Sequence, residues 1–542
     1  MSSCNIALTL AQAAEKFPDR IALIVPRNGK VTEWTFAELW VNSRRFAGIL
    51  AQQGVQRGDR VMLMVRPSME FVCLTFALFQ LGAVVILIDP GMGYRNLLRC
   101  IASVRPEVFV GIPRAYLFHL LCRRTFATVR RALLVGGPFS CLRPSRRGGK
   151  DIPSSSPPCW QASRDDQAAI IFTTGSTGPP KGVIYTHGIF FAQLDYIRSF
   201  YRITAYDRDQ PAFPLFALFS TALGACAVIP EMDPSRPARV DPRRFIGSIE
   251  QYAVSYSFGS PAIWNVVSRY CLAHGIRLGI RKVLMAGAPV SGELVERVRA
   301  VIDPGGEVHT PYGATESLPI ASIESREILA ETWPLTRQGR GTCVGRPLPG
   351  IDIRIIKPVE GAVTDAAAIA VLGPKEIGEI IVRGRVVTRA YDGNDTETSL
   401  AKIADGDSFW HRMGDMGYLD DKGRLWFCGR KAHRVLTATG VLYSVCCEAI
   451  FNEHPLVFRS ALVGIGAPGA QRPVVIVEPR EKITDTGRLL VELAELAGRN
   501  PLTTGISEFL VHPSFPVDIR HNAKIFREQL AGWAERQLKE RK

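Results

Sequence analysis

Several sequence patterns that would classify a protein quickly are missing from this 542-residue chain. Its twelve cysteines include no Cys-x-x-Cys pair, which argues against zinc ribbons and a disulfide scaffold and favours a reducing cytoplasm. The first residues lack the basic segment and apolar stretch of a secretory signal, so we expect none. Gly-x-Ser-x-Gly and His-Glu-x-x-His are also missing, which excludes the hydrolase elbow and the zinc-protease site that these motifs mark.

Acidic residues are missing from one long segment of the chain. Between Val108 and Lys150 there are nine basic residues and no acidic ones, and the whole chain has a formal charge of +15. The segment has few aromatic residues and no recognisable nucleic-acid module, so we expect no nucleic-acid partner. The pattern favours a solvated basic face, or a docking surface for an acidic partner or a membrane surface.

Uncharged segments are long enough to raise the question of a membrane span. Phe71–Ile88 has no charge over a length that meets the rule for a transmembrane helix. Gly82 divides it into a helix-like half, Phe71–Leu81, and a β-branched half, Val84–Ile88. Because helix, glycine and strand follow each other in this way in buried α/β layers, we predict no transmembrane segment. The same reasoning covers Pro211–Pro230.

Length and periodicity predict an α/β protein with more than one domain. Strand-like and helix-like segments alternate, for example Val254–Phe258, Ile263–His274 and Lys282–Met285, which is typical of a parallel sheet. From Ile351 to Val387 the segments shorten and lose their helices. This part of the chain therefore predicts an antiparallel subdomain.

A loop rich in glycine and hydroxyl groups follows the apolar, strand-like run Ala168–Phe172. It reads Thr173-Thr174-Gly175-Ser176-Thr177-Gly178-Pro179-Pro180-Lys181-Gly182-Val183. Glycines let backbone N–H groups approach an anion, hydroxyls add donors, and a lysine adds a charge that suits phosphate. We predict a polyphosphate loop; a flexible surface loop is the alternative that composition alone favours. The P-loop pattern is not met, since Pro180 precedes Lys181 and Gly182 follows it.

Further along the chain, four stretches accompany this loop in a fixed order. They are Ala286–Pro289, Tyr312–Glu316, Gly414–Tyr418 and Gly429–Arg430. The Glu316 carboxylate beside the Thr315 hydroxyl is suited to hold Mg²⁺ against phosphate oxygens. Asp415 can accept hydrogen bonds from ribose hydroxyls, and Arg430 can add donors to the same sugar. Each of these side chains alone would be an ordinary solvated group, and the nucleotide site is what the family resemblance carried by their joint order implies.

Together, these five motifs resemble those of the adenylate-forming superfamily of acyl-CoA ligases, luciferases and nonribosomal adenylation domains. The resemblance runs from about Thr9 to Lys524. The resemblance implies a ligase that uses ATP and Mg²⁺. It also implies an α/β fold with a large N-terminal domain, residues 1–429, made of doubly wound sheets and a small antiparallel β subdomain. A small, mobile α+β domain, residues 430–542, would close over the site.

The resemblance assigns roles to individual residues as well. Lys524, within His521-Asn522-Ala523-Lys524, would be the mobile lysine that meets the α-phosphate and carboxylate oxygens. The expected catalytic residues are Lys524, Glu316, Thr174 and His187, and Glu316 is also the expected metal ligand. The expected nucleotide-binding residues are Thr173, Thr174, Gly175, Ser176, Thr177, Gly178, Lys181, Ala288, Pro289, Tyr312, Gly313, Ala314, Thr315, Glu316, Asp415, Arg430 and Lys524.

The wording of several stretches is most similar to one subgroup, the olefin β-lactone synthetases of long-chain hydrocarbon biosynthesis. These stretches are Phe258–Ala262, His309–Glu316, Gly341–Pro347, Phe409–Asp415, Trp426–Val435 and His521–Glu528. The subgroup implies a long-chain 2-alkyl-3-hydroxyalkanoate whose carboxylate is adenylated. Its own 3-hydroxyl then expels AMP and closes a β-lactone, and enzymes of the same pathway are possible partners.

Departures from the acyl-CoA ligase pattern agree with this subgroup. Alanine, Ala432, stands at the hinge position, Leu436 replaces a lysine, and Gly440 comes one residue late. Ala217 replaces the histidine of Pro-Leu-Phe-His. A fatty-acyl-CoA or acyl-AMP ligase is the alternative, and a non-catalytic adenylate-binding scaffold is a more remote one.

Lactone closure by the substrate's own hydroxyl needs an apolar cavity for two alkyl arms and a base. Phe213, Phe216 and Phe219 are the predicted cavity residues, with ordinary core packing as the alternative. His187 and His411 are candidates for the base, and His411 is grouped with the substrate pocket. For each histidine, a purely structural hydrogen-bonded role is the alternative.

Overall fold

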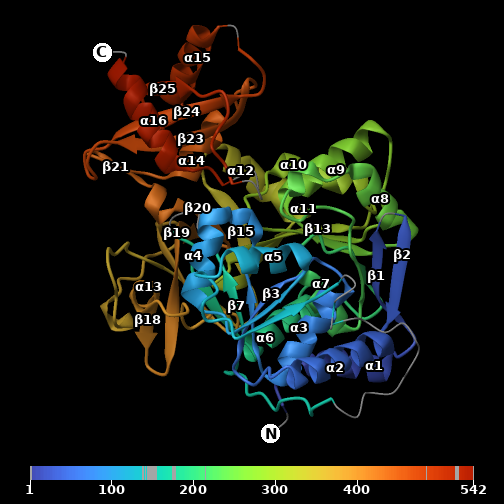
Figure 1. Cartoon of the computed structure of the whole chain (residues 1–542). Helices are drawn as coiled ribbons and strands as arrows, with labels where there is room; N and C mark the ends of the chain where they lie inside the picture. The colour runs from blue at the N-terminus through green and yellow to red at the C-terminus, as the bar shows by residue number, and fades with distance from the viewer. Residues whose placement is uncertain are drawn as a thin grey trace.

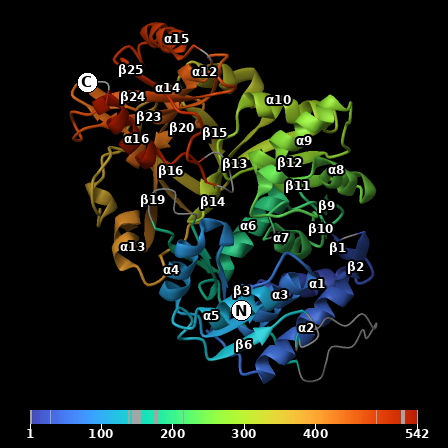
Figure 2. The same ribbon diagram turned by 45° about the horizontal axis from the view of Figure 1, so that its top comes forward.

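A computed structural model describes residues 3–27, 29–136, 140, 142, 156–173, 179–213, 215–483, 485–518 and 524–540. The predictions for Thr174, Gly175, Ser176, Thr177 and Gly178 lie outside these residues. The chain forms a large α/β body and a smaller C-terminal unit at one end of it (Figure 1). Figure 2 shows the same two parts after rotation, with the N-terminal elements far from the C-terminal unit.

One layer of the body is a six-stranded sheet in the order β6-β5-β3-β4-β7-β8. All neighbouring strands are parallel except β7 and β8. Its strands are β3 (Arg60–Met64), β4 (Val84–Leu87), β5 (Val108–Gly111), β6 (Arg131–Leu134), β7 (Gln167–Phe172) and β8 (Gly182–Thr186). The predicted phosphate loop therefore connects two hydrogen-bonded strands, β7 and β8.

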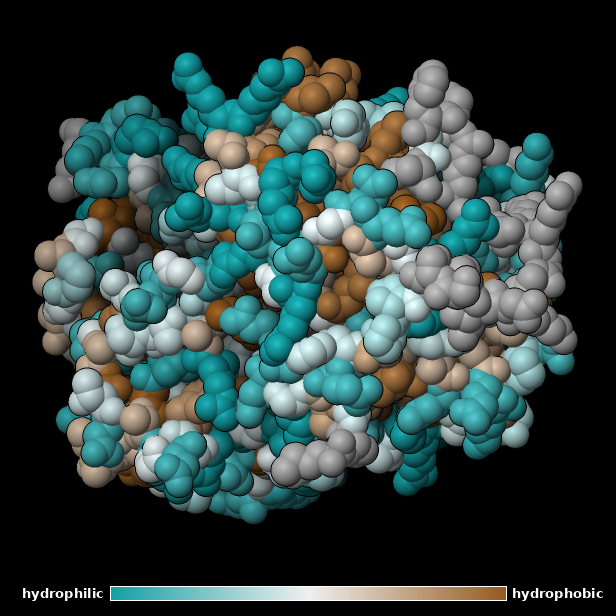
Figure 3. Space-filling model, turned by 60° about the horizontal axis from the view of Figure 1, so that its bottom comes forward, coloured by the Kyte–Doolittle hydropathy of each residue, from teal (hydrophilic) through white to brown (hydrophobic). Residues whose placement is uncertain are grey.

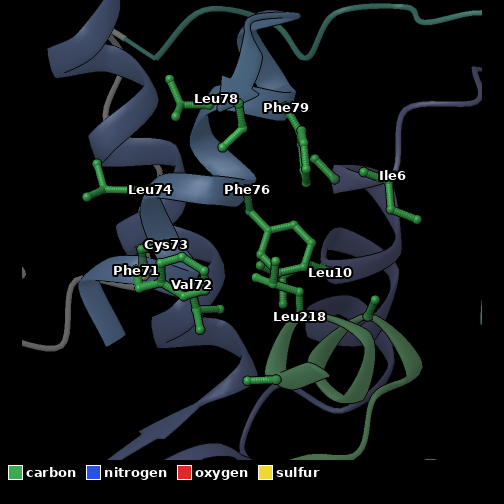
Figure 4. Packing of buried hydrophobic residues seen from close by; sticks show 14 of the residues in the cluster. Ile6, Leu10, Phe71, Val72, Cys73, Leu74, Phe76, Leu78, Phe79 and Leu218 are labelled. Atoms are coloured by element: carbon green, nitrogen blue, oxygen red, sulfur yellow. The ribbon is translucent and has the colours of Figure 1, made fainter. Parts of the chain in front are cut away.

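The uncharged segment Phe71–Ile88 is a helix and a strand, as predicted. Helix α3 (Met69–Leu81) begins after Ser68, whose side chain accepts the Phe71 N–H, and ends at Gly82 in the left-handed region. β4 then enters the middle of the sheet. Figure 4 shows Phe76 of α3 packed toward Leu10 of α1 (Ala7–Lys16), with Leu218 of α7 (Phe216–Leu223) beside them.

The second sheet has fourteen strands; one half is parallel except for the hairpin of β1 and β2, and the other half is antiparallel. The first half contains β1 (Ile21–Arg27), β2 (Lys30–Thr35), β9 (Arg208–Asp209), β10 (Cys226–Val228), β11 (Tyr256–Gly259), β12 (Lys282–Met285) and β13 (Glu307–Ala314). The other half contains β14 (Ser317–Glu324), β15 (Thr342–Pro347), β16 (Ile351–Ile356), β17 (Gly378–Gly384), β18 (Lys402–Asp405), β19 (Ser408–Leu419) and β20 (Leu425–Arg430). The predicted antiparallel subdomain is thus continuous with the parallel sheet, because β14 folds back on β13 and pairs with β15.

Helices cover the faces of both sheets, as an α/β architecture requires. Thr35 and Glu38 form a capping box at the start of α2. The other helices of the body are α4 (Tyr94–Val104), α5 (Pro113–Leu121), α6 (His187–Ser199), α8 (Pro242–Gln251), α9 (Pro261–Ala273), α10 (Gly292–Val301), α11 (Ser325–Glu327), α12 (Trp333–Arg337) and α13 (Asp395–Ala401). Helix α2 runs over Phe36–Gln52.

Beyond Arg430, the chain builds a separate three-stranded sheet of β23, β24 and β25, with helices on both faces. The elements are β21 (Val435–Thr437), β22 (Gly440–Leu442), α14 (Ser444–Phe451), β23 (Val457–Ile465), β24 (Arg472–Pro479), α15 (Thr486–Gly498), β25 (Glu508–Val511) and α16 (Arg527–Glu540). Ion pairs from Lys431 to Glu379 at 3.1 Å and from Arg434 to Glu360 at 2.9 Å link the start of this unit to the body.

Three observations concern helix length, the apolar areas of the surface and the exposure of the basic segment. In the described residues, no helix is both long and apolar enough to cross a membrane. The coloured residues in Figure 3 show apolar groups in small, separate areas. In the basic segment, Arg114, Arg123, Arg124 and Arg131 are exposed. Arg130 pairs with Asp59.

Candidate active site

The predicted adenine motifs lie side by side where parallel strands end. β12 ends at Met285 and is followed by Ala286–Pro289, while the neighbouring β13 runs on to Ala314. The carboxyl ends of parallel strands are the usual place for ligand sites in such sheets. Gly313 allows a close turn there, because a Cβ on it would lie 2.3 Å from the Ser317 carbonyl oxygen. Ala288 is half-buried and Pro289 exposed, so both are available at this edge.

Tyr312, Asp415 and Arg430 form a hydrogen-bonded cluster at the same place. The Tyr312 hydroxyl donates to Asp415 Oδ2 at 2.5 Å, and Arg430 Nη1 lies 3.0 Å from Asp415 Oδ1. Burial raises the pKa of Asp415, and the Arg430 charge opposes that shift. Although the ion pair is close, no residue that the structure describes donates an aligned hydrogen bond to Oδ1. This buried oxygen is therefore suited to accept a hydrogen bond from a ribose hydroxyl.

Glu316 is half-buried and held by residues that sequence reasoning did not select. The Tyr391 hydroxyl donates to Glu316 Oε1 at 2.7 Å. The backbone N–H of Thr388 donates to the Glu316 carbonyl at 2.9 Å, and the Tyr185 hydroxyl donates to the Thr315 carbonyl at 2.7 Å. Glu316 is thus a fixed carboxylate near Asp415, and its charge helps to raise the pKa of Asp415.

We expect Tyr391→Phe to lower the adenylation rate about tenfold, since one hydrogen bond to a charged group is lost at Glu316. The measurement is ATP–pyrophosphate exchange over a series of Mg²⁺ concentrations, in which the variant should need more Mg²⁺. Tyr418→Phe is the matched control, because its hydroxyl donates to the Arg340 carbonyl instead. Equal rates for the two variants would contradict the role of Tyr391.

Thr173 and Lys181, at the two ends of the predicted phosphate loop, lie close to Glu316 and its partner Tyr391. The Thr173 N–H donates to the Lys181 carbonyl at 3.0 Å, and the Lys181 N–H donates to Thr173 Oγ1 at 3.1 Å. The Lys181 ammonium pairs with Glu397 and lies 5.0 Å from the centre of the Tyr391 ring. The structure therefore brings Thr173, Lys181 and Glu316 into one region.

We predicted that His411 belongs to the substrate pocket, but it is not among the residues that line the apolar pocket around Phe216 and Phe219. It is buried in β19, and its Nδ1 is 3.1 Å from Lys402 Nζ and 3.2 Å from the Ala401 carbonyl. Burial, followed by the Lys402 charge, lowers the His411 pKa well below its usual range. Burial also lowers the pKa of Lys402 to about 7, against the attraction of Glu316. These contacts match the structural alternative for His411.

His187 is also placed among core residues. Its Nδ1 accepts the Ile6 N–H at 3.2 Å, and its ring packs edge-on against Phe79. Burial lowers its pKa to about 4, with Asp166 opposing. It faces a second cavity together with Trp160 and Asp166, which differs from the cavity lined by the phenylalanines. The buried structural role weighed for His187 fits these contacts.

Lys524 is held within the C-terminal unit. Its N–H donates to Asp518 Oδ1 at 3.1 Å, and the Asp518 N–H donates to the Lys524 carbonyl at 3.1 Å. A β-bridge joins Val517 and Ile525 on either side. Its described backbone partners therefore belong to that unit.

An apolar pocket adjoins the predicted nucleotide site. Phe216 and Phe219 line it, and Phe216 stacks on Phe258 with ring centres 3.5 Å apart. Phe213 packs edge-on against Phe216, so it supports the wall. The cavity volume of the pocket is about 50 Å³, and Pro311 and Leu318 lie on its wall. Pro311 precedes Tyr312 in β13, and Leu318 comes two residues after Glu316, so the pocket wall and the predicted nucleotide site share the hairpin of β13 and β14.

One carboxyl in this pocket was missed by sequence reasoning. Asp209 ends the two-residue strand β9 and is 1 % exposed. Ser220 Oγ donates to Asp209 Oδ2 at 2.5 Å and lies 3.1 Å from the Tyr256 hydroxyl. Burial raises the pKa of Asp209 to about 8. A two-residue strand carries no periodicity, so no local signal marked it.

This raised pKa predicts a pH-dependent stability. Native Asp209 keeps a proton that the unfolded chain loses near pH 3.8, so its contribution to stability falls as pH rises toward about 8. The new side chain of the Asp209→Asn variant cannot ionise. The free energy of unfolding of this variant, relative to that of the wild type, should therefore rise by about 2–3 kcal/mol between pH 6 and pH 8.5. Urea denaturation at both pH values measures this gain, and a difference that does not change with pH would contradict it.

Comparisons with known proteins identify the family of the chain and the fold that it resembles. A family profile described as AMP-binding enzyme matches residues 10–392. The chain is 44 % identical to olefin beta-lactone synthetases from Xanthomonas campestris, over 98 % of both chains, and Stenotrophomonas maltophilia, over 99 % of both. The fold is similar to that of O-succinylbenzoate coenzyme A synthetase from Bacillus subtilis in complex with ATP and magnesium ion. That likeness has a TM-score of 0.73 at 22 % identity and covers 96 % of this chain and 98 % of the other.

Proposed function

Because the chain belongs to the AMP-binding enzyme family, we propose that it is an olefin β-lactone synthetase. In this proposal it uses ATP to adenylate a long-chain 2-alkyl-3-hydroxyalkanoate. The 3-hydroxyl of the substrate then closes the β-lactone. The observation that carries the proposal is the Tyr312–Asp415–Arg430 cluster beside Glu316, together with an apolar pocket whose wall includes Pro311, the residue before Tyr312.

The residues present fit ATP and a magnesium ion. Asp415 Oδ1 would accept a ribose hydroxyl, and Thr173 and Lys181 would flank the phosphates. In the described residues, no group of three or more His, Cys, Asp or Glu side chains could hold a metal alone. Glu316 would therefore hold Mg²⁺ together with phosphate oxygens, as is usual for this ion. When bound, Mg²⁺ supplies positive charge against the phosphates.

Both steps of the reaction can be written so that atoms balance. A carboxylate oxygen of the acid bonds to the α-phosphorus of ATP, and pyrophosphate leaves. The 3-hydroxyl oxygen then bonds to the acyl carbon and its proton passes to solvent water. The bond between the acyl carbon and the phosphate-linked oxygen breaks, and AMP leaves with that former carboxylate oxygen. Holding the hydroxyl near the acyl carbon replaces a second substrate, since an intramolecular nucleophile has a high effective concentration.

We further propose that residues 1–429 bind ATP and the acid and that residues 430–542 act as a lid. Closure of the lid would carry Lys524 to the α-phosphate and carboxylate oxygens. Ala432, at the hinge position, lies between Lys431 and Arg434, which pair with Glu379 and Glu360 of the body. The exposed arginines Arg114, Arg123 and Arg124 are our candidates for docking a partner enzyme of the same pathway.

The experiment that tests the function is mass spectrometry of a reaction containing ATP, Mg²⁺ and a long-chain 2-alkyl-3-hydroxy acid, with and without CoA. We expect AMP and a product lighter than the acid by one water, formed without CoA. A thioester that forms only with CoA would contradict the proposal and indicate an acyl-CoA ligase.

A further inference from the structure

Helix α5 exposes three leucines on one face. Leu117, Leu120 and Leu121 are 57 %, 41 % and 76 % exposed. Positions three and four apart share one face of a helix, so the three side chains project from the same side of α5. Phe118 is turned toward the body instead, where its ring packs edge-on against the buried Phe126. The three leucines therefore point away from the core on which α5 packs.

Tyr94, at the start of α4, extends this apolar area. It is 60 % exposed. Its ring lies edge-on to the Phe118 ring with centres 5.8 Å apart, and its hydroxyl is 3.3 Å from Cys122 Sγ. These contacts bring the start of α4 beside α5 (Figure 1). We call the four exposed side chains the α5 patch: Tyr94, Leu117, Leu120 and Leu121.

Arginines lie at both ends of the α5 patch. Arg114 comes one turn before Leu117, and Arg123 and Arg124 follow the end of the helix. All three are exposed, and in the described part of the chain no carboxylate forms an ion pair with any of them. Neither Tyr94–Arg105 nor Val108–Lys150 contains an acidic residue. The charge around the patch is therefore of one sign.

This combination of side chains fits an anionic lipid surface. Guanidinium groups pair with phosphate oxygens, while leucine and tyrosine side chains enter the boundary between headgroups and acyl chains. Arginines alone would suit the acidic surface of a partner enzyme equally well. The exposed leucines favour a bilayer, because they can be buried there without a groove of matching shape.

We propose that the α5 patch and its three arginines dock the protein on an anionic membrane surface, with α5 lying in the plane of the headgroups. The leucines enter the edge of the acyl region, and the arginines pair with lipid phosphates. A long-chain acid of the kind proposed above partitions into lipid, so a docked enzyme would lie where its substrate gathers. The docking itself does not depend on that reaction.

Sedimentation with vesicles tests the docking without any substrate. The full-length protein is mixed with vesicles of phosphatidylcholine alone or of phosphatidylcholine and phosphatidylglycerol in equal parts. We expect binding to the mixed vesicles at about 0.1 M NaCl, and much weaker binding at about 1 M, where the screening length falls to about 3 Å. Absence of binding to the mixed vesicles at the lower salt would overturn the proposal and leave the arginines to a partner enzyme.

Two combined variants separate the apolar and the charged contributions. Joint replacement of the leucines, Leu117→Gln with Leu120→Gln and Leu121→Gln, should weaken binding to the mixed vesicles at least about tenfold. Joint replacement of the arginines, Arg114→Gln with Arg123→Gln and Arg124→Gln, should weaken it about a hundredfold. Undiminished binding by the leucine variant would contradict the insertion of α5.

The control replaces three apolar residues that are exposed elsewhere, Leu272→Gln with Leu456→Gln and Val491→Gln. It should bind the vesicles as the wild type does, and equal losses in the control and the leucine variant would contradict a specific surface. Urea denaturation checks that each variant folds. If the leucine variant does not, the single substitution Leu121→Gln takes its place, since that side chain is the most exposed of the three.

Discussion

Replacing Lys524 by alanine is expected to lower the adenylation rate at least about a hundredfold. Attack of the carboxylate on the α-phosphorus builds negative charge on the phosphate oxygens. A positioned ammonium group stabilises this charge in the transition state more than in the bound substrates. Because its backbone is tied to Asp518 in the C-terminal unit, Lys524 would deliver its charge only when that unit closes.

The loss should appear in kcat for ATP–pyrophosphate exchange, with little change in the KM for ATP. Lys539→Ala is the control, since Lys539 lies on the same unit in α16, is exposed and pairs with Glu535. The control should keep the wild-type rate. Equal rates for both variants would contradict the assignment of Lys524.

Replacing Glu379 by alanine is expected to destabilise the body by about 3–5 kcal/mol. Glu379 is 1 % exposed and receives two hydrogen bonds of 2.8 Å from the Arg412 guanidinium, and Lys431 lies 3.1 Å from it. The variant leaves the Arg412 charge buried without its carboxylate, and desolvation of an unpaired charge is expensive.

Thermal and denaturant unfolding measure this effect. Glu360→Ala is the control, because Glu360 pairs with Arg434 from a side chain that is largely exposed. A surface pair of this kind contributes less than about 1 kcal/mol. If both variants unfold at the same denaturant concentration, the expected contribution of the buried Glu379–Arg412 pair to the free energy of unfolding is wrong.

Local signals predicted the elements that depend on local chemistry. The helix–glycine–strand order around Gly82 was confirmed. It depends on residues a few positions apart. The continuity of the antiparallel strands with the parallel sheet was not predicted, because it depends on pairing between β14 and β15, far apart in sequence.

The candidate site divides in the same way. Motif order selected Glu316, Asp415 and Arg430, and the structure brings these three together. Tyr391, Lys402 and Asp209 were missed, since only folding brings them to the site and none belongs to a local pattern. His187 and His411 were selected by residue type; both are buried and hydrogen-bonded, and their role as a base stays a prediction.

The most direct test of the central claim traces the carboxylate oxygens of the substrate. The 2-alkyl-3-hydroxy acid is prepared with ¹⁸O in both carboxylate positions and incubated with ATP and Mg²⁺. Attack by the 3-hydroxyl on the acyl carbon predicts one ¹⁸O in AMP, one in the lactone carbonyl, and an unlabelled ring oxygen. AMP without label, or a lactone that keeps both labels, would contradict closure through an acyl adenylate.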